Sequence, residues 1–422
     1  MSRPSTAVHL LKTNVCQNLL FAKLKKINYG CIVIKDGENS WVFGNERSYL
    51  TCHIEVKSSR FYLSTVCAGS VGVAESYVRG EWTCDDLTKL IRIMARNWFV
   101  LDRVESGLTW FRKVISRTAH ALQRNSLRGS IRNIASHYDL SNDFFALFLD
   151  KSMMYSCAIF DPPNCSLEEA SFNKNEQICR KLMLGPGDHV LEIGTGWGGF
   201  AYHAAKYFGC SVTTSTISEK QYEFSQHFIR KSGLDDKVKV VKKDYRTLKG
   251  RFDKLVSIEM IEAVGHQYRD LFFEKCSSLL KSSGAMLLQA ITVPDQDYDR
   301  SRRNVDFIKK YIFPGSCLSS VSSILDSACR VNDFRLSHFD DLTPHYATTL
   351  RKWRQRFLAN EKQIRNMGFS SEFVRMWEYY FRYCEGGFQE RVIGDTQMLL
   401  VKPWFQSEVP IRKNLSKLIG VS

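Results

Sequence analysis

The sequence predicts an α/β fold built around a parallel β-sheet, preceded by a smaller α+β domain. From residue 189 onward, short apolar segments typical of strands alternate with helical segments, a pattern that places helices on both faces of a parallel sheet. A glycine-rich turn at 194–199 joins the first of these strands to the first helix. In residues 1–100, apolar and polar residues alternate over short segments, which indicates strands of a separate sheet.

The elements follow in order along the chain. The first domain is expected to contain strands at 31–34, 41–43 and 50–56, a glycine-punctuated helix at 69–82 and an apolar helix at 85–98. The main sheet is expected to contain strands at 189–193, 210–214, 237–241, 252–258, 285–291, 334–338 and 396–402.

These patterns predict two domains. Residues 1–125 are expected to form an α+β domain with a basic linker, and residues 126–422 a second domain built on the main sheet. Within the second, residues 292–390 are too long for a simple connection, and we interpret them as a helical insertion over the substrate site. The segment 103–132 mixes basic and apolar residues, so it is either a helix on a membrane surface or an interdomain helix.

Composition narrows the partners and the compartment. The 422-residue chain has a formal net charge of +15, which suits nucleic acid or an anionic lipid surface. We find no nucleic-acid-binding motif, no membrane-spanning apolar run and no signal peptide. The 13 cysteines are odd in number and show no metal-binding spacing, which favours reduced thiols in a cytoplasmic protein and no metal site.

The glycine turn at 194–199 indicates a nucleotide-type cofactor. Gly194, Gly196 and Gly199 fit a dinucleotide-binding spacing, but the end of the next predicted strand lacks the acid that binds a nicotinamide ribose. A sulfonium methyl donor suits the turn better, since Glu192 precedes it and can face a positive ligand. The polar residues Thr216, Ser218 and Gln221 would then meet the nucleoside, with Asp244 and Tyr245 near the adenine.

Several separated motifs resemble the cyclopropane-fatty-acyl-phospholipid synthase and mycolic acid cyclopropane synthase family. They lie at 136–145, 154–160, 190–199, 216–221, 311–315 and 377–388. The resemblance covers about residues 130–402 in order, and 69–82 resembles the smaller leading domain of the phospholipid enzymes. It implies a class I S-adenosylmethionine-dependent methyltransferase fold and alkylation of a cis double bond in an acyl chain.

The resemblance also implies site residues. A bicarbonate base would be held by groups of Cys157, Glu262, Ile291 and Tyr346, and Cys384 matches a cysteine assigned as active in the family. The residues matching the family's cofactor positions are Tyr155, Ser156, Leu191, Glu192, Gly194, Thr195, Gly196, Trp197, Gly198, Gly199, Thr216, Ile217, Ser218, Gln221, Tyr245 and Arg246.

The chemistry explains why such groups are needed. Methylation of an alkene leaves a carbocation that must be shielded from water and stabilised by negative charge or aromatic faces. A base must then remove a proton from the new methyl group for the ring to close. Glu262, just after a predicted strand, is our candidate for the acid that holds this base. Cys384 needs no covalent role, so a structural thiol is the favoured interpretation.

One position departs from the family pattern. Gln289 stands where the phospholipid enzymes often have a histidine, and glutamine can donate a hydrogen bond but cannot titrate. Ring closure is therefore predicted together with an alternative, a methyl-branched chain. Methylation of RNA or of a small molecule is the second alternative. The expected partners are an unsaturated phospholipid at the inner face of the membrane, with peripheral association, and a second copy of the chain in a homodimer.

Overall fold

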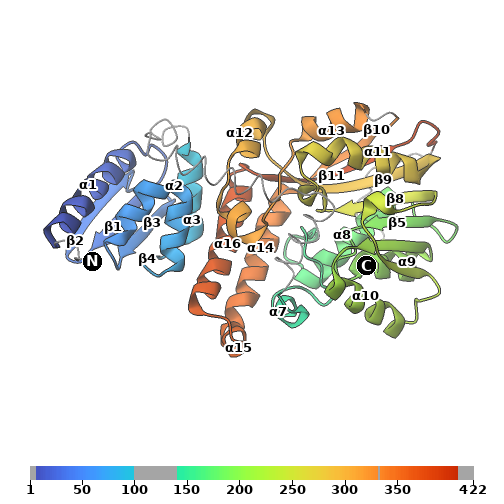
Figure 1. Cartoon of the computed structure of the whole chain (residues 1–422), viewed down its shortest axis with the longest axis horizontal. Helices are drawn as coiled ribbons and strands as arrows, with labels where there is room; N and C mark the ends of the chain where they lie inside the picture. The colour runs from blue at the N-terminus through green and yellow to red at the C-terminus, as the bar shows by residue number, and fades with distance from the viewer. Residues whose placement is uncertain (1–5, 99–139, 331–332, 407–422) are drawn as a thin grey trace, which may run out of the picture. The chain divides into compact units, whose positions relative to one another are not determined.

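The computed structural model describes residues 6–98, 140–330 and 333–406, which divide into two compact units (Figure 1). The N-terminal unit comprises residues 1–123, 303–315 and 346–393, and the sheet unit comprises 124–302, 316–345 and 394–422. The predicted basic segment at 103–132 lies outside the described residues. Among those that are described, no helix is both long enough and apolar enough to cross a membrane.

A four-stranded sheet forms one part of the N-terminal unit. Its order is β2-β1-β3-β4, with β1 and β3 parallel and the other neighbours antiparallel. The Phe21 ring packs on Trp41 and Phe43 at 4.9 and 5.0 Å between centroids. The elements are α1 (Thr6–Leu24), β1 (Cys31–Asp36), β2 (Asn39–Gly44), β3 (Thr51–Val56), α2 (Arg60–Val78), β4 (Trp82–Cys84) and α3 (Leu87–Arg96).

Two features of this sheet were not predicted. The helix α1 covers Trp41 and Phe43, and the short strand β4 brings the fully buried Trp82 into the core. The Trp82 indole donates a hydrogen bond to Ser76 Oγ at 2.9 Å. The predicted helix at 69–82 instead continues from Arg60, with a kink where Gly69 takes φ of 56°, a conformation that glycine tolerates.

Helices from late in the chain complete the N-terminal unit. They are a π-helical turn (Ile308–Ile312), α14 (Thr343–Ala359), α15 (Glu361–Asn366) and α16 (Ser371–Gln389). Glu390, after α16, accepts hydrogen bonds from Arg92 and Arg96 of α3 at 2.6 and 2.7 Å. Residues 303–315 and 346–390 of the predicted insertion are thus joined with the N-terminal domain in one unit. The predicted boundaries differ because these side-chain pairings connect segments about 300 residues apart.

The sheet unit contains a seven-stranded sheet of order β10-β11-β9-β8-β5-β6-β7. Its strands are parallel from β9 to β7, and β11 runs antiparallel to both β9 and β10. The strands are β5 (His189–Ile193), β6 (Ser211–Thr216), β7 (Val238–Lys242), β8 (Phe252–Ile258), β9 (Leu280–Thr292), β10 (Arg335–Asp341) and β11 (Gly394–Val401). All seven predicted strands are present. The residues of β10 fall within the predicted insertion at 292–390 but belong to this sheet.

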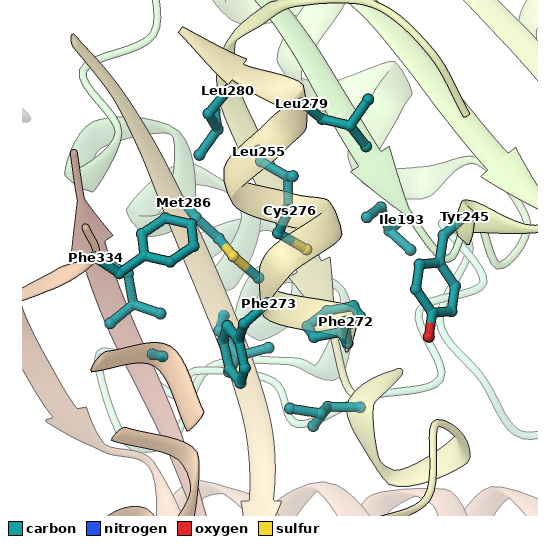
Figure 2. Close-up of a cluster of buried hydrophobic side chains, with 14 of the residues drawn as sticks. Ile193, Tyr245, Leu255, Phe272, Phe273, Cys276, Leu279, Leu280, Met286 and Phe334 are labelled. Carbon is teal, nitrogen blue, oxygen red and sulfur yellow. The ribbon is translucent and has the colours of Figure 1, made fainter. Parts of the chain in front are cut away.

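Helices cover both faces of this sheet, as predicted. One buried cluster lies between the sheet and the helices α11 and α13, where Phe272, Phe273 and Cys276 pack against Leu255 and Met286 (Figure 2). A second cluster lies under α8, α9 and α10. The remaining elements are α7 (Asn142–Ala146), α8 (Leu167–Lys181), α9 (Gly199–Phe208), α10 (Glu219–Lys231), α11 (Arg269–Leu279), α12 (Tyr298–Arg303), α13 (Val321–Arg330) and the 3-10 turns Tyr245–Thr247, Ile261–Ala263, His266–Tyr268 and Asp295–Asp297.

The strand order determines where a ligand can bind. From β5 the chain proceeds outward to β6 and β7, and then returns to the other side of β5 as β8. In open α/β sheets, a crevice forms at the carboxyl ends of the strands at such a reversal. The glycine turn after β5 and the acidic segment after β8 both lie at this edge.

Candidate active site

The turn between β5 and α9 depends on its glycines. Gly194, Gly196 and Gly198 have φ of 100°, 54° and 87°, values that residues with a side chain rarely adopt. The N–H groups of Gly194 and Thr195 both donate to the carbonyl of Ser215 at 3.0 Å, which ties the turn to β6. The turn therefore exposes backbone to a ligand while it remains anchored to the sheet.

The first glycine of α9 leaves no space for a side chain. A Cβ atom on Gly199 would lie 2.6 Å from both the carbonyl oxygen of Ser152 and the sulfur of Met154. The segment 152–156 therefore passes directly over the turn. This contact places the segment that contains Tyr155 and Ser156, both predicted from the sequence to bind the cofactor, next to the glycine turn in space.

Glu192, the predicted partner of a positive ligand, is buried beneath the turn. Its side chain accepts a hydrogen bond from Thr214 Oγ1, which also lies 2.7 Å from Thr195 Oγ1. Burial raises the pKa of the Glu192 carboxyl to about 8. A positively charged ligand would favour its ionised form. Leu191, also predicted for the site, instead faces the hydrophobic core.

The polar residues after β6 form a second wall. Thr216 Oγ1 donates to Gln221 Oε1 at 2.9 Å, and Ser218 caps α10 by accepting from the Gln221 N–H at 3.4 Å. Ile217 lies between them in the chain. The structure thus brings Thr216, Ser218 and Gln221 together at the end of the strand next to the glycine turn.

Aromatic rings close another side of the turn. The Trp197 indole donates to Asn142 Oδ1 at 2.8 Å and its ring packs on Phe145 at 4.9 Å. The Tyr155 ring lies 5.4 Å from Phe145 and 6.1 Å from Phe148. The residues of α7 were not assigned as site residues, although the motif at 136–145 contained Asn142 and Phe145. Only their contacts with Trp197 and Tyr155 in the folded protein place Asn142 and Phe145 beside the glycine turn.

The side chains of Tyr245 and Arg246, both predicted to bind the cofactor, contact other residues of the protein. Tyr245 belongs to the buried cluster of Figure 2, with its ring 5.4 Å from that of Phe272. Arg246 forms an ion pair with Asp244 at 2.6 Å. The Tyr245 ring therefore contributes to the core, and its cofactor role stays a prediction for its backbone and for the Asp244–Arg246 pair.

Carboxylates gather after β8 and beside β9. Glu259 Oε1 accepts hydrogen bonds from the Cys157 N–H and from Gln289 Nε2, both at 2.8 Å. Glu262 Oε1 accepts from the Ile291 N–H at 2.6 Å. Glu259 has φ of 48°, a strained conformation that is common at functional sites. The structure therefore brings together four predicted residues, Cys157, Glu262, Gln289 and Ile291.

Two charged residues of this cluster were not predicted. Asp395 of β11 is fully buried and accepts from Gln289 Nε2 at 3.2 Å. Lys174 of α8 is also fully buried and donates to Ser156 Oγ at 2.7 Å. Polar residues at alternate positions of an apolar strand, Asp395 and Gln397, were the sequence signal that could have identified this face of β11.

The cluster has an excess of negative charge. Burial, and next the charge of Glu259, raise the pKa of Glu262 to about 8. Burial, followed by the charges of Glu259 and Glu262, also raises the pKa of Asp395, whereas burial lowers the pKa of Lys174. Glu262 Oε2 and Asp395 Oδ1 are buried oxygens with no hydrogen-bond partner among the described residues. Unpartnered buried carboxylate oxygens are suited to stabilise a cation or to accept a proton.

The structure does not test the bicarbonate prediction. The Cys157 and Ile291 N–H groups, which the prediction assigns to the anion, donate here to Glu259 and Glu262. The Glu262 and Asp395 carboxyls, whose pKa values are raised, would donate to an anion when protonated and repel it when ionised. We therefore assign no step to bicarbonate. Among the described residues, no three metal-ligating side chains converge on a possible metal site.

Three further predicted residues, Cys157, Tyr346 and Cys384, contribute through packing or through the backbone. Burial raises the pKa of the Cys157 thiol well above its ordinary value, so its backbone N–H is its contribution to the cluster. Tyr346 and Cys384 belong to the N-terminal unit, where the Tyr346 ring stacks on Phe388 at 4.4 Å. Burial also raises the pKa of the Cys384 thiol, which argues against a thiolate nucleophile.

Comparison with known proteins adds independent evidence. The profile of the family described as mycolic acid cyclopropane synthetase matches residues 125–398. Tuberculostearic acid methyltransferase UfaA1 of Mycobacterium tuberculosis is 36% identical over 341 residues, which cover 79% of each chain. Cyclopropane-fatty-acyl-phospholipid synthase of Escherichia coli K12 is 38% identical over 343 residues, covering 81% of this chain and 85% of the relative.

Solved structures agree with these matches. The cyclopropane synthase MmaA2 of Mycobacterium tuberculosis superimposes with a TM-score of 0.61 at 29% identity, covering 64% of this chain and 98% of that chain. The mycolic acid cyclopropane synthase CmaA1, complexed with SAH and CTAB, gives a TM-score of 0.59 at 31% identity over the same shares of each chain.

Proposed function

This chain belongs to the mycolic acid cyclopropane synthetase family, and from that premise we propose that it converts the cis double bond of unsaturated phospholipid acyl chains into a cyclopropane ring. It has the class I methyltransferase fold and is an S-adenosylmethionine-dependent methyltransferase that modifies lipids. The choice of phospholipid follows the name of the Escherichia coli relative.

The residues around the glycine turn fit the methyl donor. Gly194–Gly199 present backbone to it, while Thr216, Ser218 and Gln221 line one side and Trp197 and Tyr155 another. When bound, the donor supplies a methyl group on a positively charged sulfur. The buried Glu192 carboxylate lies beneath the turn, where negative charge favours such a cation.

The excess of buried carboxylates is the observation that carries the proposal. Glu259, Glu262 and Asp395 share a site in which Lys174 is the neighbouring cation. Such a site destabilises anionic ligands and stabilises positive charge that develops on a neutral chain. Alkylation of an alkene creates positive charge of this kind.

Glu262 is our candidate for the proton acceptor. Transfer of the methyl group to one alkene carbon leaves the positive charge on the other carbon. Glu262 Oε2, which has no hydrogen-bond partner in the described part of the chain, can take a proton from the new methyl group, and the electron pair of that C–H bond then closes the ring. Protons next to a carbocation are very acidic, so a buried carboxylate is a sufficient base.

A methyl-branched product is the second candidate. Gln289 lies in the cluster and cannot carry protons, and one relative is named a tuberculostearic acid methyltransferase. For the setting of the reaction, we propose the inner face of the membrane, since the net charge of +15 favours an anionic lipid surface. A homodimer stays a prediction.

Isotope labelling tests the proposed function. Cells that express the chain and are fed methionine with a trideuterated methyl group should yield phospholipids whose monounsaturated chains gain a CD2 unit. Ring closure removes one deuteron and adds no hydrogen, whereas a saturated methyl branch also needs a hydride from a separate reductant, so the branched chain is heavier than the cyclopropane chain. Lipid mass spectrometry distinguishes the two products. Unchanged lipids in cells that contain folded, cofactor-binding protein would contradict the proposal.

The close approach at Gly199 gives a second test. Gly199→Ala should displace the Ser152 carbonyl, and with it Tyr155 and Ser156, because the new Cβ has no space. We expect affinity for S-adenosylhomocysteine to fall at least about tenfold, the equivalent of about 1.4 kcal/mol, as measured by calorimetry. Gly187→Ala is the control, since nothing lies within 4 Å of a Cβ atom there. Equal affinities of the two variants would show that the contact is unimportant.

A further inference from the structure

A row of buried amides lies on one face of the sheet beside the carboxylate cluster. β9 and β11 pair antiparallel, with Gln289 opposite Gln397 and Ile291 opposite Asp395. Register partners and alternate residues of a strand share a face, so Gln289, Gln397 and Asp395 all face the same side. Lys181 of α8 reaches this face and bonds to Gln397. Gln289, Gln397 and Asp395 are each at most 1% exposed.

The hydrogen bonds of this row are all donated in one direction, from Lys181 toward the carboxylates. Lys181 Nζ donates to Gln397 Oε1 and forms an ion pair with Asp340 at 2.5 Å. Gln397 Nε2 then donates to Gln289 Oε1 at 3.0 Å. Gln289 Nε2 donates in turn to Glu259 Oε1 at 2.8 Å and Asp395 Oδ2 at 3.2 Å. Because an ammonium group can only donate, Lys181 determines the orientation of both amides.

This direction matters for the carboxylates. If the Gln289 amide turned over, its acceptor oxygen would face two carboxylates, and if Gln397 turned over, its oxygen would face that of Gln289 and favour the same turn of Gln289. A buried acceptor facing a carboxylate is unfavourable. In the observed orientation, the Gln289 NH2 group bridges Glu259 and Asp395 and lies 3.4 Å from the Cys157 carbonyl oxygen, while Asp395 Oδ1 has no partner among the described residues. The row therefore determines which carboxylate oxygens stay available to the reacting chain.

From this geometry we propose that Lys181 and Gln397 are positioning residues, which act through Gln289 to hold the Glu259 and Asp395 carboxylates for alkylation. The inference rests on the proposed function of the same site. The charged and titratable groups that act on Asp395 are Glu259 and Glu262 after β8, Lys174 of α8 and Cys157. Lys181 and Gln397 therefore act on the pKa values of these groups through Gln289, without contacting the substrate.

Isosteric variants of Gln397 test this inference. In Gln397→Glu, the new carboxylate keeps its contact with Lys181 but cannot donate to Gln289, so the Gln289 amide turns and opposes Glu259 and Asp395. In Gln397→Met, the donor is lost without a new charge. For both variants we expect kcat to fall about tenfold and the acid limb of the pH profile, which depends on Glu262 beside Glu259, to move by about one unit, with the lipid KM nearly unchanged. Lys181→Met should behave in the same way.

The matched control is Lys402→Met. Lys402 is also a buried lysine next to β11, and it donates to Ser277 Oγ at 2.8 Å and pairs with Asp333 at 2.5 Å, away from the amide row. It should lose stability but keep the pH profile of the unmodified chain. Wild-type kcat and pH profile in both Gln397 variants, or an equal shift in Lys402→Met, would overturn the inference.

Failure of the proposed function is distinguishable from failure of this inference. An unmodified chain that methylates no lipid contradicts the proposed function alone. Calorimetry of S-adenosylmethionine binding against pH needs no acyl substrate, and Lys174, which bonds to the predicted cofactor residue Ser156, connects the donor site to the same carboxylates. A shift of about one pH unit in the Gln397 variants, absent from Lys402→Met, supports the positioning role in that assay, and coincident curves refute it.

Discussion

Glu262→Gln is expected to reduce cyclopropane formation by about a thousandfold, within the range of about 10²–10⁴ typical of a lost general base. The Glu262 Oε2 atom is buried with no hydrogen-bond partner among the residues that the structure describes, and its Oε1 accepts from the Ile291 N–H. Glutamine keeps the size of the side chain but cannot accept the proton. Lipid mass spectrometry of the purified protein with vesicles of unsaturated phospholipid measures the loss.

The same residue predicts a pH dependence. The pKa of Glu262 is raised to about 8, first by burial and next by Glu259. Because the base must be ionised, kcat/KM should rise with pH and level off above about 8 in the unmodified chain. The positive charge of the bound donor lowers this pKa, so the limb of kcat should lie at lower pH. Glu274→Gln, at an exposed position of α11, is the control, and an acid limb preserved in Glu262→Gln would exclude Glu262 as the base.

The raised pKa also has a consequence for stability. Between the ordinary pKa of 4.5 and the folded value of about 8, the folded state binds the proton more tightly than the unfolded chain. The contribution of Glu262 to stability is therefore lost as pH rises through that window. Glu262→Gln should gain stability relative to the unmodified chain at pH 8.5 compared with pH 5, as thermal denaturation would measure.

Lys174→Met has the largest expected effect on stability. Lys174 is fully buried, bonds to Ser156 and lies near Glu259, Asp150 and Asp395. Removing one partner of a buried charge group leaves the others uncompensated, so the free energy of unfolding should fall by about 3–5 kcal/mol. Chemical denaturation followed by circular dichroism measures this change.

An exposed lysine supplies the comparison for that experiment. Lys231→Met, at the exposed end of α10, should change the free energy of unfolding by no more than about 0.5 kcal/mol. A Lys174→Met protein as stable as the Lys231→Met protein would show that the carboxylates do not need this cation.

The sequence by itself determined the α/β sheet and the glycine turn, and it predicted the residues that bind the cofactor around that turn. Strand and helix patterns depend on local periodicity, and the positive φ values at Gly194, Gly196 and Gly198 are a local backbone requirement. Glu262, Cys157, Gln289 and Ile291 were identified because each lies in or beside a motif that resembles one family.

Only the tertiary structure decided which charges share the reaction site. Asp395 and Gln397 meet Gln289 because β11 returns beside β9 in an antiparallel register, more than 100 residues later in the chain. Lys174 joins them from α8, on the opposite side of the glycine turn in sequence. Such long-range pairing depends on burial and hydrogen-bond geometry that no local pattern encodes, and it also assigned residues 303–315 and 346–393 to the N-terminal unit.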